Sequence, residues 1–90
     1  SVSGDDVTEE FVDLGSRLRN LEATRDRLLD LLARATRVED ALQVNAALTD
    51  VQGQIEQIQG RMTYLRDSAA FSTITAELQP VPPPPALIEP

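Results

Sequence analysis

The chain has 90 residues and a mass of 9.8 kDa, so it allows one domain at most and a small hydrophobic core. Fifteen acidic residues against eight basic ones give a net charge of −7, which argues against binding to nucleic acid or to an anionic lipid surface. Without His or Cys there is no imidazole base, thiol nucleophile, disulfide or ordinary zinc site. We therefore expect no enzyme: no catalytic residue, no cofactor and no metal.

The first residues are acidic and precede a long helical pattern. We expect residues 1–6 to hold the end of an upstream strand followed by the cap of a helix, with Asp6 or Thr8 as the N-cap. The carboxylates between residues 5 and 10 suit the positive end of a helix dipole. The chain begins with Ser1 and has no apolar stretch of 18 residues, so we interpret it as an excised soluble fragment.

The middle of the chain contains two apolar stripes whose spacing alternates between three and four residues. No proline occurs between Glu9 and Ala70, and Arg25 is the one seam position that is not apolar. Sustained heptad seams predict coiled-coil helices with a left-handed supercoil. The seam positions are Val7, Phe11, Leu14, Leu18, Leu21, Arg25, Leu28, Leu32 and Ala35 in the first stripe, and Ala41, Val44, Leu48, Val51, Ile55, Ile58, Met62, Leu65 and Ala69 in the second.

A capping signal separates the two stripes. Thr36 and Glu39 have the Thr-x-x-Glu spacing of a capping box, which predicts that a new helix starts at Arg37. Residues 7–70 then form an antiparallel coiled-coil hairpin with a tight turn at 35–37. One continuous helix through the same residues is the alternative.

Folding the chain at this turn brings the two stripes together along their whole length. It faces Leu18 with Ile55 and Phe11 with Met62. Each arm has roughly 28 to 32 residues, and is therefore about 42 to 48 Å long.

The pattern changes after the second stripe. Residues 71–79 alternate between apolar and polar side chains and are rich in β-branched types, which predicts a half-buried β-strand. Its natural partner is the segment at residues 1–3, so we expect a mainly α fold with short terminal strands at the open end of the hairpin. Residues 80–90 hold all six prolines and read as a stiff linker, or alternatively as a docking site for a proline-reading domain.

Two polar residues, one in each predicted helix, are candidates for setting the helix register. Arg25 occupies a seam position opposite Leu48, with Asn45 nearby. A polar seam residue usually selects register or partner, and Arg can extend its guanidinium past the edge of the seam. The alternative is a charged contact with another protein.

Apolar residues near the turn extend beyond a single seam. A hairpin of two helices cannot cover all of them, so we predict an interaction surface made of Leu29, Leu31, Val38 and Leu42. A second hairpin packed there gives a homodimer with a four-helix bundle. Alternatively, the turn folds Val38 and Leu42 over the end of its own hairpin.

Three glycines interrupt the helices: Gly15, Gly53 and Gly60. Each is expected to destabilise its helix by about 1 kcal/mol relative to Ala. Either a close approach of the two backbones or a flexible section near the base explains them.

Several segments resemble the bacterial domain-of-unknown-function family 4349. They are residues 7–14, 17–23, 55–65 and 72–75, and the resemblance covers roughly residues 1–79. It implies a membrane-tethered, extracytoplasmic envelope protein with a helical hairpin inserted between strands and a membrane span beyond the proline tail. Gly15 and Gln52 depart from the family pattern, which bears on the rigidity of the shaft. The resemblance implies no activity and no catalytic residues.

We therefore expect a non-enzymatic module for self-association or protein contacts, with another envelope protein as a possible partner. One alternative is an adaptor hairpin that docks an outer-membrane channel. Arg25 and Leu32 have the spacing of its tip motif, but Glu39 stands where Ser or Thr is expected. A spacer arm of a ligand-sensing envelope protein is the other alternative.

Overall fold

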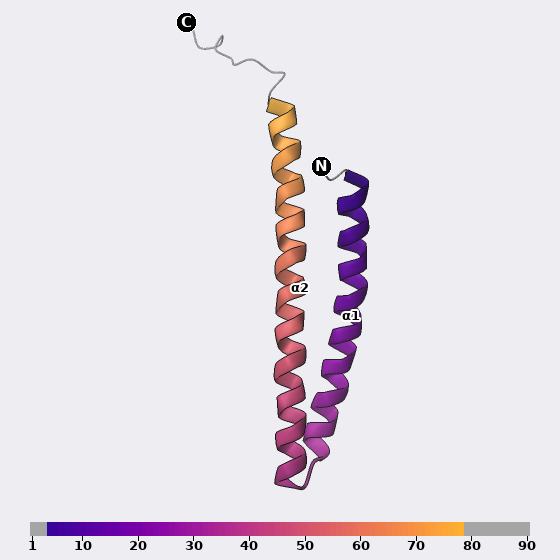
Figure 1. Cartoon of the computed structure of the whole chain (residues 1–90), viewed down its shortest axis with the longest axis vertical. Helices are drawn as coiled ribbons and strands as arrows, with labels where there is room; N and C mark the ends of the chain where they lie inside the picture. The colour runs from indigo at the N-terminus through magenta and orange to yellow at the C-terminus, as the bar shows by residue number, and fades with distance from the viewer. Residues whose placement is uncertain (1–3, 79–90) are drawn as a thin grey trace, which may run out of the picture.

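Two long helices form an antiparallel hairpin, as expected from the two stripes (Figure 1). The computed structural model describes residues 4–78, with side chains for residues 4–69. Helix α1 comprises Gly4–Arg34 and helix α2 comprises Val38–Leu78, and residues 35–37 connect them. At 1.5 Å per residue, α1 is about 46 Å and α2 about 61 Å long. The free ends of both helices lie at the same end of the molecule, opposite the turn.

The predicted seam is the line along which the helices pack. Every predicted seam position is buried or half-buried except Ala69, which is exposed. Ile55 is the most completely buried side chain among the described residues, with 1% of its surface exposed. The other buried side chains are Leu14, Val51 and Leu65. The six seam side chains nearest the turn are only half-buried: Leu28, Leu32, Ala35, Ala41, Val44 and Leu48. The tip half of the hairpin is therefore the less enclosed half.

The turn is held by backbone hydrogen bonds. The amide of Ala35 donates to the carbonyl of Leu32 at 3.2 Å, and the amide of Ala41 donates to the carbonyl of Arg37 at 3.0 Å. Since the N-cap carbonyl accepts the first bond of a helix, Arg37 is the N-cap of α2. The helix therefore begins at Val38, one residue later than the predicted start at Arg37.

The predicted capping box does not form within this described connection. No hydrogen bond joins the side chain of Thr36 or Glu39 to a backbone amide there. The Glu39 carboxylate instead lies 3.7 Å from Nε of Arg37. This ion pair takes the place of the hydrogen bond that the carboxylate would accept from the cap amide in a capping box. Glu39 and Asp40 still place negative charge in the first turn of α2, where the helix dipole favours it.

The start of α1 also differs from the prediction. Gly4, Asp5 and Asp6 already belong to the helix, so the strand end and cap expected at residues 1–6 are wrong for residues 4–6. Residues 1–3 lie outside the described residues. The hydroxyl of Thr8 donates to the carbonyl of Gly4 at 3.0 Å, a bond typical of Thr inside a helix. Thr8 is therefore not a cap.

The predicted strand at residues 71–79 is wrong, because α2 continues without interruption to Leu78. Only the first turn of a helix has an unfavourable nucleation free energy. Extending an existing helix through β-branched residues is therefore easier than starting a strand that lacks a partner. Phe71, Ile74 and Leu78 also follow the three-and-four spacing of a helix. Residue 79 and the proline-rich segment 80–90 lie outside the part of the chain that the structure describes.

The glycines are not explained by close packing. A Cβ atom at Gly53 or Gly60 would meet no heavy atom within 4 Å. At Gly15 it would lie 3.7 Å from Nη1 of Arg19 and 3.8 Å from Cε of Met62, which is ordinary contact. Close approach of the backbones is therefore not required at any of these three positions.

Candidate interaction surface

The hairpin presents two flanks, one on each side of the seam. Residues that directly follow a seam residue turn to one flank, and residues that directly precede one turn to the other. We call the first the Leu29 flank, and its outward side chains include Val12, Arg19, Leu29, Leu42, Thr49 and Glu56. Val38 lies one helical turn before Leu42 and belongs to the same flank. We call the second the Glu10 flank, and its outward side chains include Glu10, Arg17, Leu31, Asp40, Arg61 and Tyr64.

Each flank contains an open groove between α1 and α2. The groove on the Leu29 flank has a volume of about 530 Å³ and is lined by Arg25, Leu29, Leu48, Thr49, Gln52, Gly53 and Glu56. The groove on the Glu10 flank has a volume of about 350 Å³, lies closer to the turn, and is lined by Leu31, Arg34, Ala35, Asp40, Gln43 and Val44. Both grooves expose apolar side chains of the tip half on their floors.

The structure divides the four predicted surface residues between the two flanks. All four are exposed: 48% for Leu29, 50% for Leu31, 72% for Val38 and 64% for Leu42. Leu29 and Leu31 line different grooves. Val38 and Leu42 are one helical turn apart and share the flank of Leu29 by their heptad positions. The predicted surface is thus a cluster of three on one flank and a single Leu on the other.

A fourth exposed apolar residue, Val12, belongs to the same flank as that cluster. It follows the seam residue Phe11, and 61% of its surface is exposed. On the Glu10 flank the large exposed apolar residues are Leu31 and Tyr64. The apolar side chains of the described part of the hairpin are therefore concentrated on the Leu29 flank.

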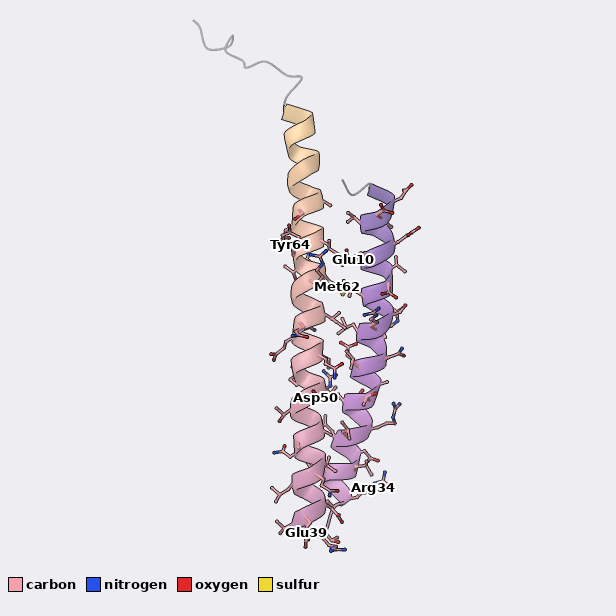
Figure 2. The ribbon with its side chains drawn as sticks, in the orientation of Figure 1. Glu10, Arg34, Glu39, Asp50, Met62 and Tyr64 are labelled. Atoms are coloured by element: carbon pink, nitrogen blue, oxygen red, sulfur yellow. The ribbon has the colours of Figure 1, made fainter. Side chains whose placement is uncertain are left out.

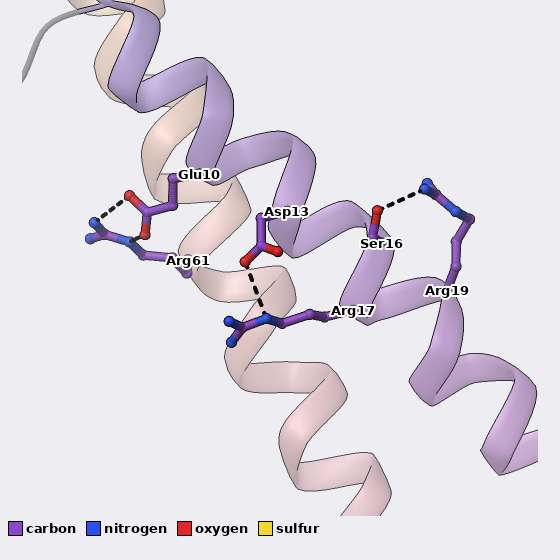
Figure 3. A network of polar contacts seen from close by, with 6 residues as sticks. All are labelled: Glu10, Asp13, Ser16, Arg17, Arg19 and Arg61. Atoms are coloured by element: carbon purple, nitrogen blue, oxygen red, sulfur yellow. Dashed lines mark hydrogen bonds and ion pairs between the residues drawn. The ribbon is translucent and has the colours of Figure 1, made fainter.

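The Glu10 flank carries an ion pair between the two helices. Nε and Nη2 of Arg61 donate to the two carboxylate oxygens of Glu10, at 2.8 and 3.1 Å (Figure 3). The hydrogen bond from Arg61 lowers the pKa of the Glu10 carboxyl and raises that of the guanidinium. The guanidinium also lies 5.4 Å from the ring centre of Tyr64. Glu10 and Tyr64 lie toward the open end, whereas Arg34 and Glu39 lie near the turn (Figure 2).

The sequence contains a signal for this pair that the heptad analysis did not use. Glu10 directly precedes Phe11 and Arg61 directly precedes Met62, and those two seam residues face each other. Opposite charges at the preceding positions of one facing layer are the usual sites of interhelical ion pairs.

Other charges on this flank are paired within one helix. Arg17 lies 3.1 Å from Asp13, and Arg34 pairs with Asp30, both at a spacing of four residues (Figure 3 for the first pair). Such exposed pairs are typical of a face in contact with water. The Glu10 flank is therefore the more hydrophilic of the two.

The two predicted register residues are not brought into contact. Arg25 is half-buried at the edge of the seam, lines the groove of the Leu29 flank, and lies 3.5 Å from Asp26. Asn45 is exposed, and its carbonyl accepts a hydrogen bond from Thr49 Oγ1 at 3.1 Å. Their role in register stays a prediction.

Within the described residues, no group of three or more acidic side chains is placed to hold a metal ion. Neither α1 nor the described length of α2 is apolar enough over 18 residues to cross a membrane.

Comparison with known proteins identifies the family of the chain. A family model described as a domain of unknown function, DUF4349, matches residues 1–89. No curated protein and no solved structure matches the chain. The match confirms the resemblance seen in the sequence and extends it into the proline-rich segment.

Proposed function

Since the chain belongs to the domain-of-unknown-function family DUF4349, whose description names no activity, we propose a role from the geometry: a non-enzymatic module for self-association. The observation that carries this proposal is the incomplete enclosure of the tip half. Six seam side chains there are only half-buried, and Leu29, Val38 and Leu42 stand exposed beside them. A second hairpin would cover both sets at once.

The energetics of a lone hairpin favour the same role. Among the residues whose side chains the structure describes, four are buried, and the two helices order more than seventy residues. A single two-helix seam removes little apolar surface from water relative to the conformational entropy that the helices lose. Association supplies the missing burial, and it does so where the seam is least enclosed.

We place this module in an extracytoplasmic, membrane-tethered envelope protein. The support is the family resemblance and the position of both helix ends opposite the tip, which directs the tip away from whatever the ends are attached to. Another envelope protein is then a possible second partner. Protease accessibility of the tip in intact spheroplasts producing the protein tests this location, and protection of the tip would contradict it.

Sedimentation equilibrium of the 90-residue chain between 1 and 100 µM tests self-association. We expect about twice the monomer mass of 9.8 kDa at the upper concentrations. A monomer throughout this range would overturn the proposal.

Two substitutions test which flank is involved. If the Leu29 flank is the interface, Leu42→Glu should lower the mass measured by sedimentation toward that of the monomer. If the Glu10 flank is the interface, Leu31→Glu should do so instead. Ala46→Glu is the matched control, because it adds the same charge to an exposed position on the side of α2 that faces away from α1. Helicity by circular dichroism should stay unchanged in every variant that keeps the wild-type mass, since each position is exposed and Glu is a good helix former. A variant that dissociates should lose part of its helicity, because association supplies part of the burial.

A further inference from the structure

The Leu29 flank has features that suit a second copy of this chain in one particular orientation. Leu18 faces Ile55 in the seam, so the next residues, Arg19 and Glu56, lie at nearly the same height on the outer edges of this flank. They do not pair with each other. Arg19 donates to Ser16 Oγ at 3.2 Å, and Glu56 accepts from Gln52 Nε2 at 3.2 Å.

A two-fold axis parallel to the helices would place α1 of one copy over α2 of the other with both turns at the same end. Residues at equal height on the outer edges then meet across the interface. Arg19 would lie over Glu56 of the partner subunit, and the reverse contact would form by symmetry. The dimer would therefore contain two such contacts between opposite charges, one on each side of the two-fold axis.

The apolar residues obey the same relation. Leu32 faces Ala41 in the seam, so the following residues, Ala33 and Leu42, also share one height. In this arrangement each Leu42 lies over Ala33 of the partner subunit, next to the exposed Leu29 and Val38 of both copies. Reversing one copy, so that the turns lie at opposite ends, would instead place this apolar tip against the open end of the other hairpin.

The size of the flank is sufficient for a stable dimer. It is about 46 Å long, the length of α1, and about 18 Å across two helices, which gives on the order of 800 Å² per copy. This is the area of a standard protein interface. The groove beside Leu29 also offers about 530 Å³ into which side chains of the other copy can pack.

We infer that the hairpin forms a two-fold dimer through its Leu29 flank, with both turns at the same end and with Arg19 paired to Glu56 of the partner subunit. The inference rests on the proposed self-association and specifies its partner, surface and orientation. The Glu10 flank, with its paired charges, would remain in water.

Charge reversal tests the predicted contact. In the 90-residue chain, Arg19→Glu and Glu56→Arg should each raise the dimer dissociation constant by about tenfold, because each places like charges opposite one another. The double variant should restore the wild-type constant. Arg27→Glu and Asp50→Arg are the matched controls, since both positions are exposed on the other side of the seam. Circular dichroism checks that every variant remains helical.

A distance measurement tests the orientation. The chain has no cysteine, so Glu39→Cys places a single spin label at the tip of each copy. With both turns at one end, the two labels should lie within about 30 Å of each other, whereas a reversed dimer separates them by more than about 40 Å along the helices.

The outcomes distinguish this inference from the proposed function. A dimer whose dissociation constant is unchanged by the single reversals, or whose labels are far apart, overturns the inference and leaves self-association standing. A wild-type chain that is monomeric at 100 µM overturns both. Weakening by each reversal, rescue by the double variant and a short distance between labels support it.

Discussion

Glu10 and Arg61 are 51 positions apart in the sequence and are joined by two hydrogen bonds across the seam. Each flanks one member of the facing pair Phe11 and Met62. The fork of an arginine matches both oxygens of a carboxylate only in one relative position, so the pair selects a single register for the two helices. Its value to the fold lies in specificity, because exposed ion pairs contribute little to stability.

This pair predicts a pH dependence of stability. The Glu10 pKa lies below its ordinary value of 4.5 in the folded hairpin, so the contribution of the pair is present in full above that pH. It is lost as the pH falls through the lowered value. Urea unfolding at fixed protein concentration should show a smaller loss of stability on acidification for Glu10→Gln than for the wild type. Glu9→Gln, which removes the neighbouring exposed carboxylate, is the control. It should lose as much stability on acidification as the wild type does.

Truncation of the most buried side chain should strongly destabilise the hairpin. Ile55→Ala removes a side chain that is 1% exposed, and such changes typically destabilise by about 2–5 kcal/mol. We expect a large fall in helicity at 25 °C, measured at 222 nm, and an intermediate effect for Ile55→Val. Gln57→Ala, an exposed position two residues away, should change the free energy of unfolding by less than about 0.5 kcal/mol.

Replacing a glycine should stabilise α2. A Cβ at Gly60 meets nothing within 4 Å, so Gly60→Ala gains helix propensity without a clash. The expected gain is about 0.5–1 kcal/mol, measured by thermal or urea unfolding at one protein concentration. Gly15→Ala should gain no more than this, because its Cβ would touch the ends of Arg19 and Met62. A loss of stability at Gly60 would mean that its side of α2 is covered.

The turn offers a further test. Because Arg37 is the N-cap of α2, Arg37→Asn should stabilise the hairpin by about 0.5–2 kcal/mol through a better cap. Thr36→Ala should have almost no effect, since the hydroxyl makes no capping bond in the described turn. If Thr36→Ala instead lowered stability by about 1 kcal/mol, the cap would belong at Thr36. Thermal unfolding of both variants at equal concentration gives the comparison.

The seam was predictable because hydrophobic spacing is a repeated signal. Seventeen of its eighteen positions are buried or half-buried, and the exception is Ala69 on α2, at the open end of the hairpin. The segment from 71 to 78 was not predictable from its local composition. Its β-branched residues favour a strand in isolation, but a helix already formed over more than thirty residues extends through them.

The candidate surface was predictable in its members and not in its arrangement. A hairpin of two helices covers only one seam, so the apolar residues outside that seam are exposed. They include Leu29, Leu31, Val38 and Leu42. Their division between two flanks depends on whether each precedes or follows a seam residue, a distinction that the sequence contains but that the expectation of a single surface did not use.

The location of the two helix ends has a mechanical consequence. The start of α1 and the end of α2 both point away from the turn, and α2 extends past Gly4, so tension applied between these two ends would pull the helices apart sideways. The facing pairs of seam residues then bear the force one after another and not all at once. The two helices should therefore separate at low force, starting at their free ends and proceeding toward the turn. The ion pair between Glu10 and Arg61 lies close to the end where this separation begins.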